Sequence, residues 1–373
     1  MIVIMLYLLK IFMRVSLTFN VKKETAAELV DAQSNGSDIK RFFDNNLVQN
    51  YSHRLSDKYA EWDDAETINA VKNAIEKAGH EVTLIEADEN AFQKLKEARP
   101  DIVFNIAEGF KGESRESQIP SMLEMLGIPY TGSDALTLGI CLDKTRAKEI
   151  LSYHNIPNAK FIMIDRYQPL SNHSFEFPLI VKPSLEGSSK GIFSSSLVKN
   201  YDELNSEIKR VIEEYNQPAI IEEYLPGREF TVALLGNGQR TKILPIIEIK
   251  FEDFPEGVEH LYSYEAKWIL DTKESDFDVF ECPASIEKKL EKKIKDTVLK
   301  TYNVLRCKDW SRIDVRLDKN GIPNIIEINP LPGIMPDPTE NSSFPKAARA
   351  AGLDYNEMIQ NVLYEACIRY NLL

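Results

Sequence analysis

Near the C-terminal end of the chain, two carboxylates and one amide are spaced so that they could meet on one face of a β-hairpin. The run RIDVRLDKNGIPNIIEIN alternates polar and apolar residues on either side of an Asn-Gly pair, which is typical of a two-residue type I′ turn. With the turn at this pair, Asp314 lies opposite Glu327, and Arg312 lies opposite Asn329 on the same polar face. Carboxylate and amide oxygens are ligands that Mg²⁺ takes together with phosphates. The hairpin therefore predicts a magnesium site beside an anionic ligand.

The alternative is a solvated face whose two carboxylates share no ligand, and directly opposed carboxylates destabilise a strand pair. The register also depends on the turn, because a turn one residue longer would flip the side chains to the other face. In the two-residue register, the apolar face consists of Ile313, Val315, Leu317, Ile326 and Ile328. The magnesium prediction therefore requires a phosphate-binding element elsewhere in the chain.

The sequence LEGSSKG provides such an element. Gly187 and Gly191 flank two serines, so successive backbone N–H groups can turn toward one centre and form an anion-binding nest. Lys182 ends the apolar strand FPLIVK just before it, where its ammonium group could bind a phosphate. Small-residue turns and solvated lysines at strand ends are common, so neither feature is specific alone. Together with the hairpin, they indicate a nucleotide site.

The segment EEYLPGREF is a third candidate element. Glu222 and Glu223 follow an apolar strand, and Glu229 lies beyond a Pro-Gly turn. A segment that leaves a strand can hydrogen-bond an adenine through its backbone, while a carboxylate binds ribose hydroxyl groups. The alternative is an ordinary hinge between two domains.

The elements that must position these residues begin with a parallel α/β unit. A strand from Met13 is followed by helices over about 66–78 and 89–98, each leading into an apolar strand, EVTLIEA and then DIVFNIA. This βαβαβ series predicts a doubly wound parallel domain over 13–133. It contains no GxGxxG after its first strand, so it does not predict dinucleotide binding. A polar stretch over 22–62 is expected to form a long surface loop.

From residue 134 onward the pattern is typical of α+β units. We expect a helix over 143–154, several strands that can pair in antiparallel fashion, and closing helices over 346–351 and 354–370. Between these strands, the spacing of Leu204, Ile208, Val211 and Ile212 predicts a further helix. The hinge-like segment divides this part into a central unit, 134–226, and a C-terminal unit, 227–373.

Composition excludes several function classes. The chain has 373 residues with 58 acidic and 45 basic side chains, a net charge of −13, which argues against nucleic-acid or anionic-membrane partners. Four cysteines without a CxxC pair and five histidines without ligand spacing support neither a zinc site nor a disulfide framework, and indicate a reducing, cytoplasmic setting. The apolar run at the start is too short to span a bilayer. We interpret residues 1–12 as an upstream extension of a start at Met13.

With these motifs, the sequence resembles the ATP-grasp superfamily and, within it, the D-alanine–D-alanine ligases. The likeness extends from about residue 66 to residue 370, and it rests on runs in matching order: GIPYTGSDALTLGICLDKTRAK, VKPSLEGSSKG, IIEEYLPGREFTV, YSYEAKW, SRIDVRLDKNGIPNIIEINPLPG and FPKAARAAGLDY. The resemblance implies an ATP-grasp fold, in which an N-terminal doubly wound parallel-sheet domain precedes two α+β subdomains that clamp ATP.

The resemblance also implies residue roles. It assigns ATP binding to Lys144, Lys182, Glu186, Gly187, Ser188, Ser189, Glu222, Glu223, Tyr224, Leu225, Glu229 and Lys267. It assigns two Mg²⁺ ions to Asp314, Glu327 and Asn329. Arg312 and the Gly333 backbone match groups that stabilise the reaction centre, and Ser188 matches a member of the network that closes the phosphate loop.

Departures from the family pattern fall in the amino-acid subsites. The family's glycine-rich first loop has no counterpart here beyond a guess at Asp63, Asp64 or Glu66. The family's histidine of the HG segment is replaced by Glu108, although Glu113 still matches its acidic residue. A tyrosine is replaced by Trp268, and the carboxylate-binding serine matches Ser342 across a longer stretch. ATP-dependent amide formation is therefore a firmer expectation than D-alanine as the substrate.

Three functions remain open at this stage. The first is a D-alanine–D-alanine ligase, which joins two amino acids through an acyl phosphate. The second is a ligase of the same build for other amino acids or a peptide-like natural product. The third is a nucleotide-binding protein without catalysis, which retention of Lys182, Arg312 and Asp314 disfavours. The family suggests a homodimer.

Overall fold

The computed structural model describes residues 12–22, 61–172, 174–251, 261–264, 266–267 and 279–373. Three sequence predictions fall largely or wholly outside these residues: the extension over 1–12, the polar loop over 22–62, and the site residue Trp268.

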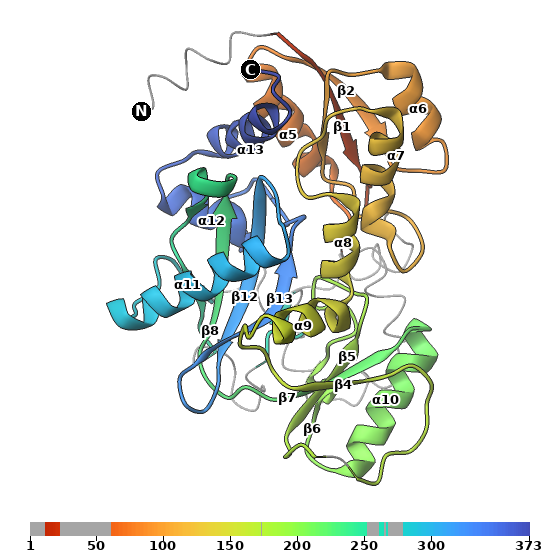
Figure 1. Ribbon diagram of the computed structural model, residues 1–373, viewed down its shortest axis with the longest axis vertical. Coiled ribbons are helices and arrows are strands. Elements are labelled where there is room, and N and C mark those ends of the chain that lie inside the picture. The colour runs from red at the N-terminus through yellow and green to blue at the C-terminus, as the bar shows by residue number, and fades with distance from the viewer. Residues whose placement is uncertain (1–11, 23–60, 173, 252–260, 265, 268–278) are drawn as a thin grey trace, which may run out of the picture.

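A three-stranded parallel sheet forms the N-terminal part, with strand order β2-β1-β3 (Figure 1). Its elements are β1 (Arg14–Phe19), α5 (Ala65–Lys77), β2 (Glu81–Glu86), α6 (Ala91–Ala98) and β3 (Ile102–Asn105). Helix α5 begins at Asp64, whose side chain accepts a hydrogen bond from the Thr67 N–H, and it buries Ile68, Val71 and Ile75. These residues have the helical spacing that predicted this helix. Helix α7 (Gln118–Leu126), which we did not predict, packs with α6 over the other face of the sheet.

A four-stranded antiparallel sheet forms the central part. Its strand order is β4-β7-β5-β6, from β4 (Phe161–Ile164), β5 (Leu179–Pro183), β6 (Leu197–Val198) and β7 (Ala219–Glu223). Helix α10 (Tyr201–Tyr215) covers it with Leu204, Ile208 and Val211, three of the residues that predicted this helix. Helices α8 (Ala135–Leu142) and α9 (Lys144–Tyr153) precede the sheet, and in Figure 1 α9 lies between it and β13.

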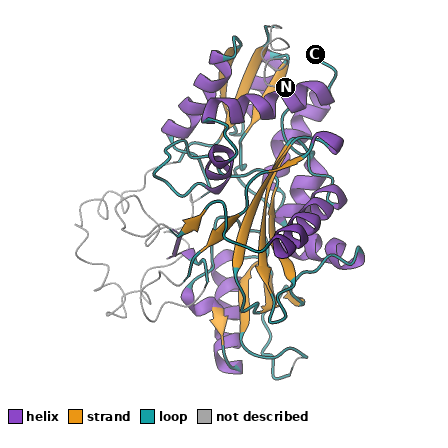
Figure 2. Ribbon diagram, turned by 90° about the vertical axis from the view of Figure 1, so that its left-hand side faces the viewer, coloured by secondary structure: helices purple, strands orange, loops and turns teal. Residues whose placement is uncertain are grey.

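A six-stranded sheet forms the C-terminal part, with order β11-β10-β8-β12-β13 and β9 paired to β8. Its strands are β8 (Glu229–Leu235), β9 (Lys242–Ile243), β10 (Ile247–Ile249), β11 (Phe280–Glu281), β12 (Trp310–Leu317) and β13 (Pro323–Asn329). Figure 2 shows the long strands running side by side with helices packed along them. The helices are α11 (Lys288–Val304), α12 (Ser343–Ala350) and α13 (Tyr355–Arg369), of which α11 was not predicted.

The hairpin of β12 and β13 has the predicted pairs but not the predicted turn. Asp314 pairs with Glu327 and Arg312 with Asn329, as expected. The turn, however, is a three-residue loop: the Asp318 N–H donates to the Ile322 carbonyl, and only its last residue, a glycine, has a positive φ of 72°. This longer turn shifts the register by one residue, and a β-bulge next to Asp314 shifts it back.

The bulge also corrects the predicted apolar face. Ile326 is the extra residue of the bulge and lines the cavity described below, whereas Ile325 takes its place in the core and is 1% exposed. The pairing at the polar face was therefore right although the turn type and one core residue were wrong.

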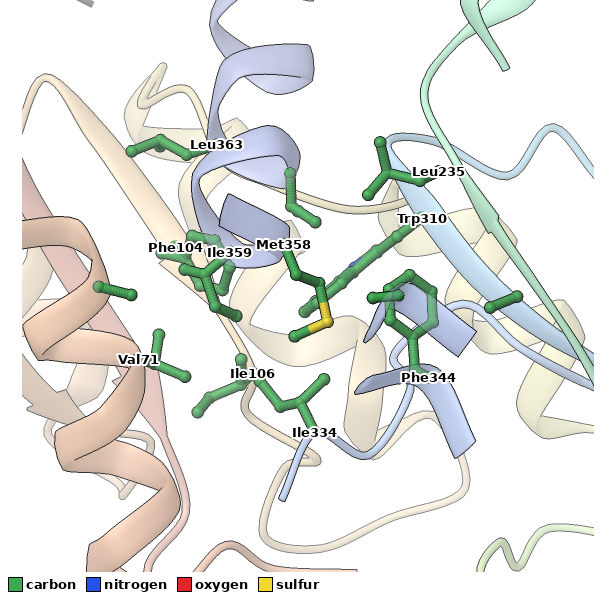
Figure 3. Packing of buried hydrophobic residues seen from close by; sticks show 14 of the residues in the cluster. Val71, Phe104, Ile106, Leu235, Trp310, Ile334, Phe344, Met358, Ile359 and Leu363 are labelled. Atoms are coloured by element: carbon green, nitrogen blue, oxygen red, sulfur yellow. The ribbon is translucent and has the colours of Figure 1, made fainter. Parts of the chain in front are cut away.

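The N-terminal and C-terminal sheets share one hydrophobic core. Figure 3 shows Val71 and Phe104 from the first part facing Trp310, Phe344 and residues of α13 from the last part. The Phe104 and Trp310 rings are 5.7 Å apart and nearly perpendicular, and Trp310 meets Phe344 in the same way. This core anchors both sheets to each other, so residues from both can hold fixed positions around one site. The three unit boundaries stay a prediction.

None of the described helices is long and apolar enough to cross a bilayer.

Candidate active site

A cavity of about 390 Å³ is lined by residues of the N-terminal, central and C-terminal parts of the chain. Most of the residues predicted from the sequence line it: Lys144, Lys182, Glu186, Gly187, Ser188, Ser189, Glu222, Glu223, Leu225, Glu229, Lys267, Arg312, Asp314, Glu327, Asn329, Gly333 and Ser342. Glu113 and Tyr224 are not among the lining residues. The cavity therefore brings together segments that are almost 200 residues apart in the chain.

The polar face of the β12–β13 hairpin forms one wall. Asp314 accepts hydrogen bonds from the Arg312 guanidinium at 3.1 and 2.9 Å, from the Thr231 hydroxyl at 2.6 Å and from the Asn329 amide at 3.3 Å. Lys144 Nζ lies 2.8 Å from Glu327 Oε1. Although burial opposes ionisation of Glu327, Lys144 and Arg312 outweigh it and hold the Glu327 pKa at about 2.

This wall has the composition of a magnesium site. Asp314 and Glu327 supply hard carboxylate oxygens on one face. The Asn329 amide donates an N–H to Asp314, which leaves the amide oxygen for another ligand. Within the described part of the chain, no group of three or more His, Cys, Asp or Glu side chains has the geometry of a metal site. The donor set is therefore one that needs ligand phosphates to complete it.

A buried charge triad lies at the end of β5 and β7. Glu222 forms ion pairs with Lys182 at 2.8 Å and with Lys148 at 3.0 Å, and each of these side chains is less than 10% exposed. Burial alone would raise the Glu222 pKa, but the two lysines lower it. Lys148 was missed from the sequence, although its position four residues after Lys144 places both on one face of α9.

Glu229 lies at the start of β8, where it pairs with Arg316 of the hairpin strand β12. Its carboxylate accepts from Arg316 at 2.8 Å, and the same guanidinium donates to the Tyr224 hydroxyl at 2.8 Å. The Tyr224 side chain thus supports Arg316 instead of facing the cavity. Arg316 was also missed, although the two-residue period of β12 places it on the same face as Arg312 and Asp314.

The LEGSSKG segment folds into a tight turn beside Lys182. Ser188 and Ser189 both have left-handed backbone angles, φ 50° and 60°. Gly191 has φ 72°, and a Cβ atom there would lie 2.4 Å from Pro183. The Gly187 N–H donates to Glu61 at 2.7 Å. The N–H groups of this turn are thus directed in part at a carboxylate, which occupies the position of an anion.

Glu61 belongs to an ion-pair network that the sequence reasoning did not find. Arg115 donates to Glu61 at 2.7 Å and lies 3.3 Å from Glu186, and Lys190 lies 2.6 Å from Glu186. The Lys144 ammonium also donates to the Glu186 carbonyl. Glu61 lies in the polar stretch that we read as a loop, where spacing carries no signal. The network ties the phosphate-loop candidate to the N-terminal part.

Lys267 and the segment after β13 form the far wall. Burial, together with the nearby Arg312 charge, lowers the Lys267 pKa to about 8. Ser342 accepts from the Met335 N–H at 3.1 Å and donates to the Gly333 carbonyl at 3.3 Å, so its hydroxyl group holds this segment together. The Gly333 N–H has no acceptor among the described residues, and it faces the same cavity as Arg312.

The N-terminal end of the cavity differs from the sequence expectation. Glu113 is exposed, as is Glu66 in the first turn of α5, whereas Asp63, Asp64 and Glu108 line the cavity. A further lining residue, Glu116, was missed because it is separated from Glu108 by a loop whose path the sequence does not show.

The chain is similar to proteins of one enzyme family. The D-ala D-ala ligase C-terminus family matches residues 150–364. The D-alanine–D-alanine ligase of Haemophilus influenzae is 33% identical over 300 residues, which are 79% of this chain and 93% of that protein. An uncharacterised protein of Sinorhizobium fredii, y4sG, is 35% identical over 317 residues, 83% of this chain and 90% of its own length.

A solved structure supports the fold assignment. The crystal structure of D-alanine–D-alanine ligase from Bacillus anthracis complexed with ATP has a TM-score of 0.67 at 23% identity, and covers 97% of this chain and 100% of that chain. The predicted ATP-grasp fold, with a parallel N-terminal sheet and two antiparallel sheets, is confirmed. The chain belongs to the D-alanine–D-alanine ligase family, a family of ATP-dependent ligases.

Proposed function

We propose that this protein joins two amino acids in an ATP-dependent reaction that proceeds through an acyl phosphate. The observation that carries this proposal is the single cavity, which runs from Glu222 and Leu225 past Asp314 and Arg312 to carboxylates of the N-terminal part. A nucleotide at one end and an amino acid at the other would meet beside Arg312.

The nucleotide end offers a complete set of groups for ATP. The backbone from Glu222 to Leu225 would bind the adenine, and Glu229, oriented by Arg316, would bind the ribose. Lys144, Lys182 and Lys267 would neutralise the phosphates, with the turn over Glu186–Ser189 above them. In the structure, Lys182 is paired with Glu222 and Lys144 with Glu327, so bound phosphates would replace carboxylates that already stabilise these charges.

Asp314, Glu327 and Asn329 would hold two Mg²⁺ ions together with the phosphates. When bound, magnesium neutralises charge on the transferring phosphoryl group. In the structure, Lys144 pairs with Glu327 and Arg312 pairs with Asp314. If magnesium took over the two carboxylates, both cations could pair with the phosphates instead.

The chain's own residues can then carry both chemical steps. In the first, a substrate carboxylate attacks the γ-phosphate, which forms an acyl phosphate and ADP. In the second, an amine attacks the acyl carbon, the amide bond forms and phosphate leaves. Arg312 and the Gly333 N–H would stabilise the oxyanion that develops at that carbon. Covering the acyl phosphate with the Ser188–Ser189 turn would protect it from water.

The departures in the amino-acid subsites favour substrates other than D-alanine as the second candidate. Glu108, which replaces the family's histidine, lines the cavity and changes the charge of this end. A homodimer and a non-catalytic scaffold stay as further predictions, the latter disfavoured by the intact nucleotide end.

The test is an ADP-release assay over D- and L-amino acids, singly and in pairs, with ATP and Mg²⁺. We expect ADP release that depends on a pair of amino acids and yields one peptide bond per ADP. Turnover with L-amino acids only would exclude a D-alanine–D-alanine ligase in the strict sense. ATP binding without turnover on any pair would leave the scaffold.

A further inference from the structure

Three acidic side chains at the N-terminal end of the cavity have no ion-pair partner among the described residues. Asp63, Glu108 and Glu116 all line the cavity. Their side chains make no hydrogen bond or ion pair to any described residue, and Glu116 is only 9% exposed. Burial raises the pKa of Asp63 and that of Glu116 to about 8, and raises the pKa of Glu108 well above its usual range. Burying unpaired acids is costly, so the structure keeps them at a price that a ligand could offset.

The loop that carries two of these acids is built to hold them together. Gly109 has φ 84°, and a Cβ atom there would lie 2.2 Å from the Arg115 carbonyl oxygen. The Gly109 N–H donates to the Asn20 side chain at 2.8 Å. These contacts bring the backbone next to Glu108 against the backbone next to Glu116, and the Glu116 charge adds to burial in raising the Glu108 pKa.

The nearby cations are already engaged. Arg115 is bound by Glu61 and Glu186, and Lys144 is bound by Glu327. Lys22 adds one positive charge to the same wall, where Asp64 adds one further negative charge. A cationic group that enters this end of the cavity would therefore favour the ionised forms of the three acids, whose pKa values burial raises.

The α-amino groups of ordinary substrates do not balance this charge. The substrate that supplies the carboxylate brings one α-ammonium group. The amine that attacks must lose its proton first, so it cannot remain a lasting counter-ion. Two neutral amino acids such as alanine therefore bring one lasting cation to a site with three acids, which is too few to ionise all of them.

The wall beside these acids also has an apolar surface. Trp62 lines the cavity next to Asp63, and its ring lies 6.0 Å from that of Phe110. Aromatic faces attract cations and cover the aliphatic stems of long basic side chains.

We propose that Glu108 and Glu116, with Asp63 beside them, bind the positively charged side chain of a basic amino-acid substrate, whose aliphatic stem packs on Trp62. This inference rests on the proposed ligase function, because it names the substrate class of the same cavity. An ammonium or guanidinium group would fit the three acids as a charged hydrogen-bond donor.

The test compares basic amino acids with neutral analogues of matching length. Binding of D- and L-lysine, norleucine, arginine and citrulline is measured calorimetrically to the full chain with Mg²⁺ and a non-hydrolysable ATP analogue. We expect at least one basic amino acid to bind about 10- to 100-fold more tightly than its neutral analogue. Equal affinity for lysine and norleucine, and for arginine and citrulline, would overturn the proposal.

Variants test which residues cause the preference for basic over neutral amino acids. Glu108→Gln, Glu116→Gln and Glu108→His should each reduce the basic-to-neutral ratio about tenfold or more, whereas the exposed Glu89→Gln should retain it. An equal loss of affinity for basic and neutral amino acids in these variants would also overturn the proposal. If one variant does not fold, the wild-type comparison and the other variants still decide.

ADP release on the same amino acids separates the two proposals. Preferential binding of a basic amino acid without any ADP release would support the charge inference and contradict the ligase. ADP release from neutral pairs without any preference for basic ones would do the reverse.

Discussion

The two ends of the cavity treat buried carboxylates in opposite ways. At the nucleotide end, Glu222, Glu229 and Glu327 each have a cation within 3 Å. At the other end, Glu108 and Glu116 have no partner among the described residues. The carboxylates of the first end are already paired with cations. Phosphates that bind there would replace carboxylates as the partners of these cations. At the second end, only a cationic substrate group would stabilise the ionised acids, which makes charge a source of specificity.

The largest effect is expected where pairing is most complete. Glu222→Gln would leave Lys148 and Lys182 buried without a counter-charge, and should lower the free energy of unfolding by about 3–5 kcal/mol. Denaturant unfolding measures this, with Glu89→Gln as the exposed control. A loss no larger than that of the control would mean that the nucleotide end is not stabilised by its ion pairs.

Asp314→Asn should reduce Mg²⁺-dependent ADP release by roughly 100-fold or more and leave the protein folded. The reason is that the amide is a weaker magnesium ligand and cannot hold Arg312 as an ion pair. Steady-state kinetics over a range of Mg²⁺ concentrations, together with thermal melting, measure this. Retained activity with a higher melting temperature would identify the hairpin face as a repulsive surface without a ligand.

Because of Lys267, we expect the kcat/KM for ATP to depend on pH. Because its pKa is about 8, the side chain loses its positive charge as the pH rises through 8, and kcat/KM for ATP should fall by up to about tenfold per pH unit above that value. In Lys267→Arg the charge persists, so this fall should disappear. A fall of the same size in both proteins would assign it to another group.

The smallest effect has the opposite sign to that of Glu222→Gln. The Glu116 pKa is about 8 in the folded protein, above its usual value of 4.5, so the folded state binds more protons between these values and stability falls as the pH rises through that window. Glu116→Gln removes this loss and should stabilise the protein by about 1 kcal/mol or more at pH 8, but not near pH 4. Destabilisation at pH 8 would show that a cation pairs with Glu116 and that the two ends are alike.

The same comparison shows what the sequence could and could not predict. Residues near one another in the chain, such as Asp314 and Glu327, follow from strand alternation, and their pairing was predicted. Even in this hairpin, a longer turn shifts the strand register and a bulge shifts it back, and the alternation of polar and apolar residues reveals neither feature. Lys148 and Arg316 were within reach, because helix and strand periods place them beside predicted residues.

The substrate end was less predictable for a physical reason. Glu61 and Glu116 reach the cavity through loops, and a loop's path is set by long-range contacts such as the Gly109–Arg115 approach. The Glu108 substitution was visible in the sequence, but that its carboxylate lacks a partner became apparent only from the fold. Helices α5, α6, α9, α10, α12 and α13 were predicted, whereas α7, α8 and α11 were not, although α11 is the longest of the described helices.

The central claim is that the cavity transfers the γ-phosphoryl group of ATP to a substrate carboxylate. The most direct measurement uses the amino-acid pair with the highest ADP release, with ¹⁸O in the carboxylate of the amino acid that is activated, and determines the mass of the phosphate released. Our account predicts one ¹⁸O atom in each phosphate. The amine attacks the acyl carbon and breaks its bond to the bridging oxygen, so the phosphate leaves with one oxygen of the substrate carboxylate. Phosphate without ¹⁸O, formed with the same ADP release, would contradict it.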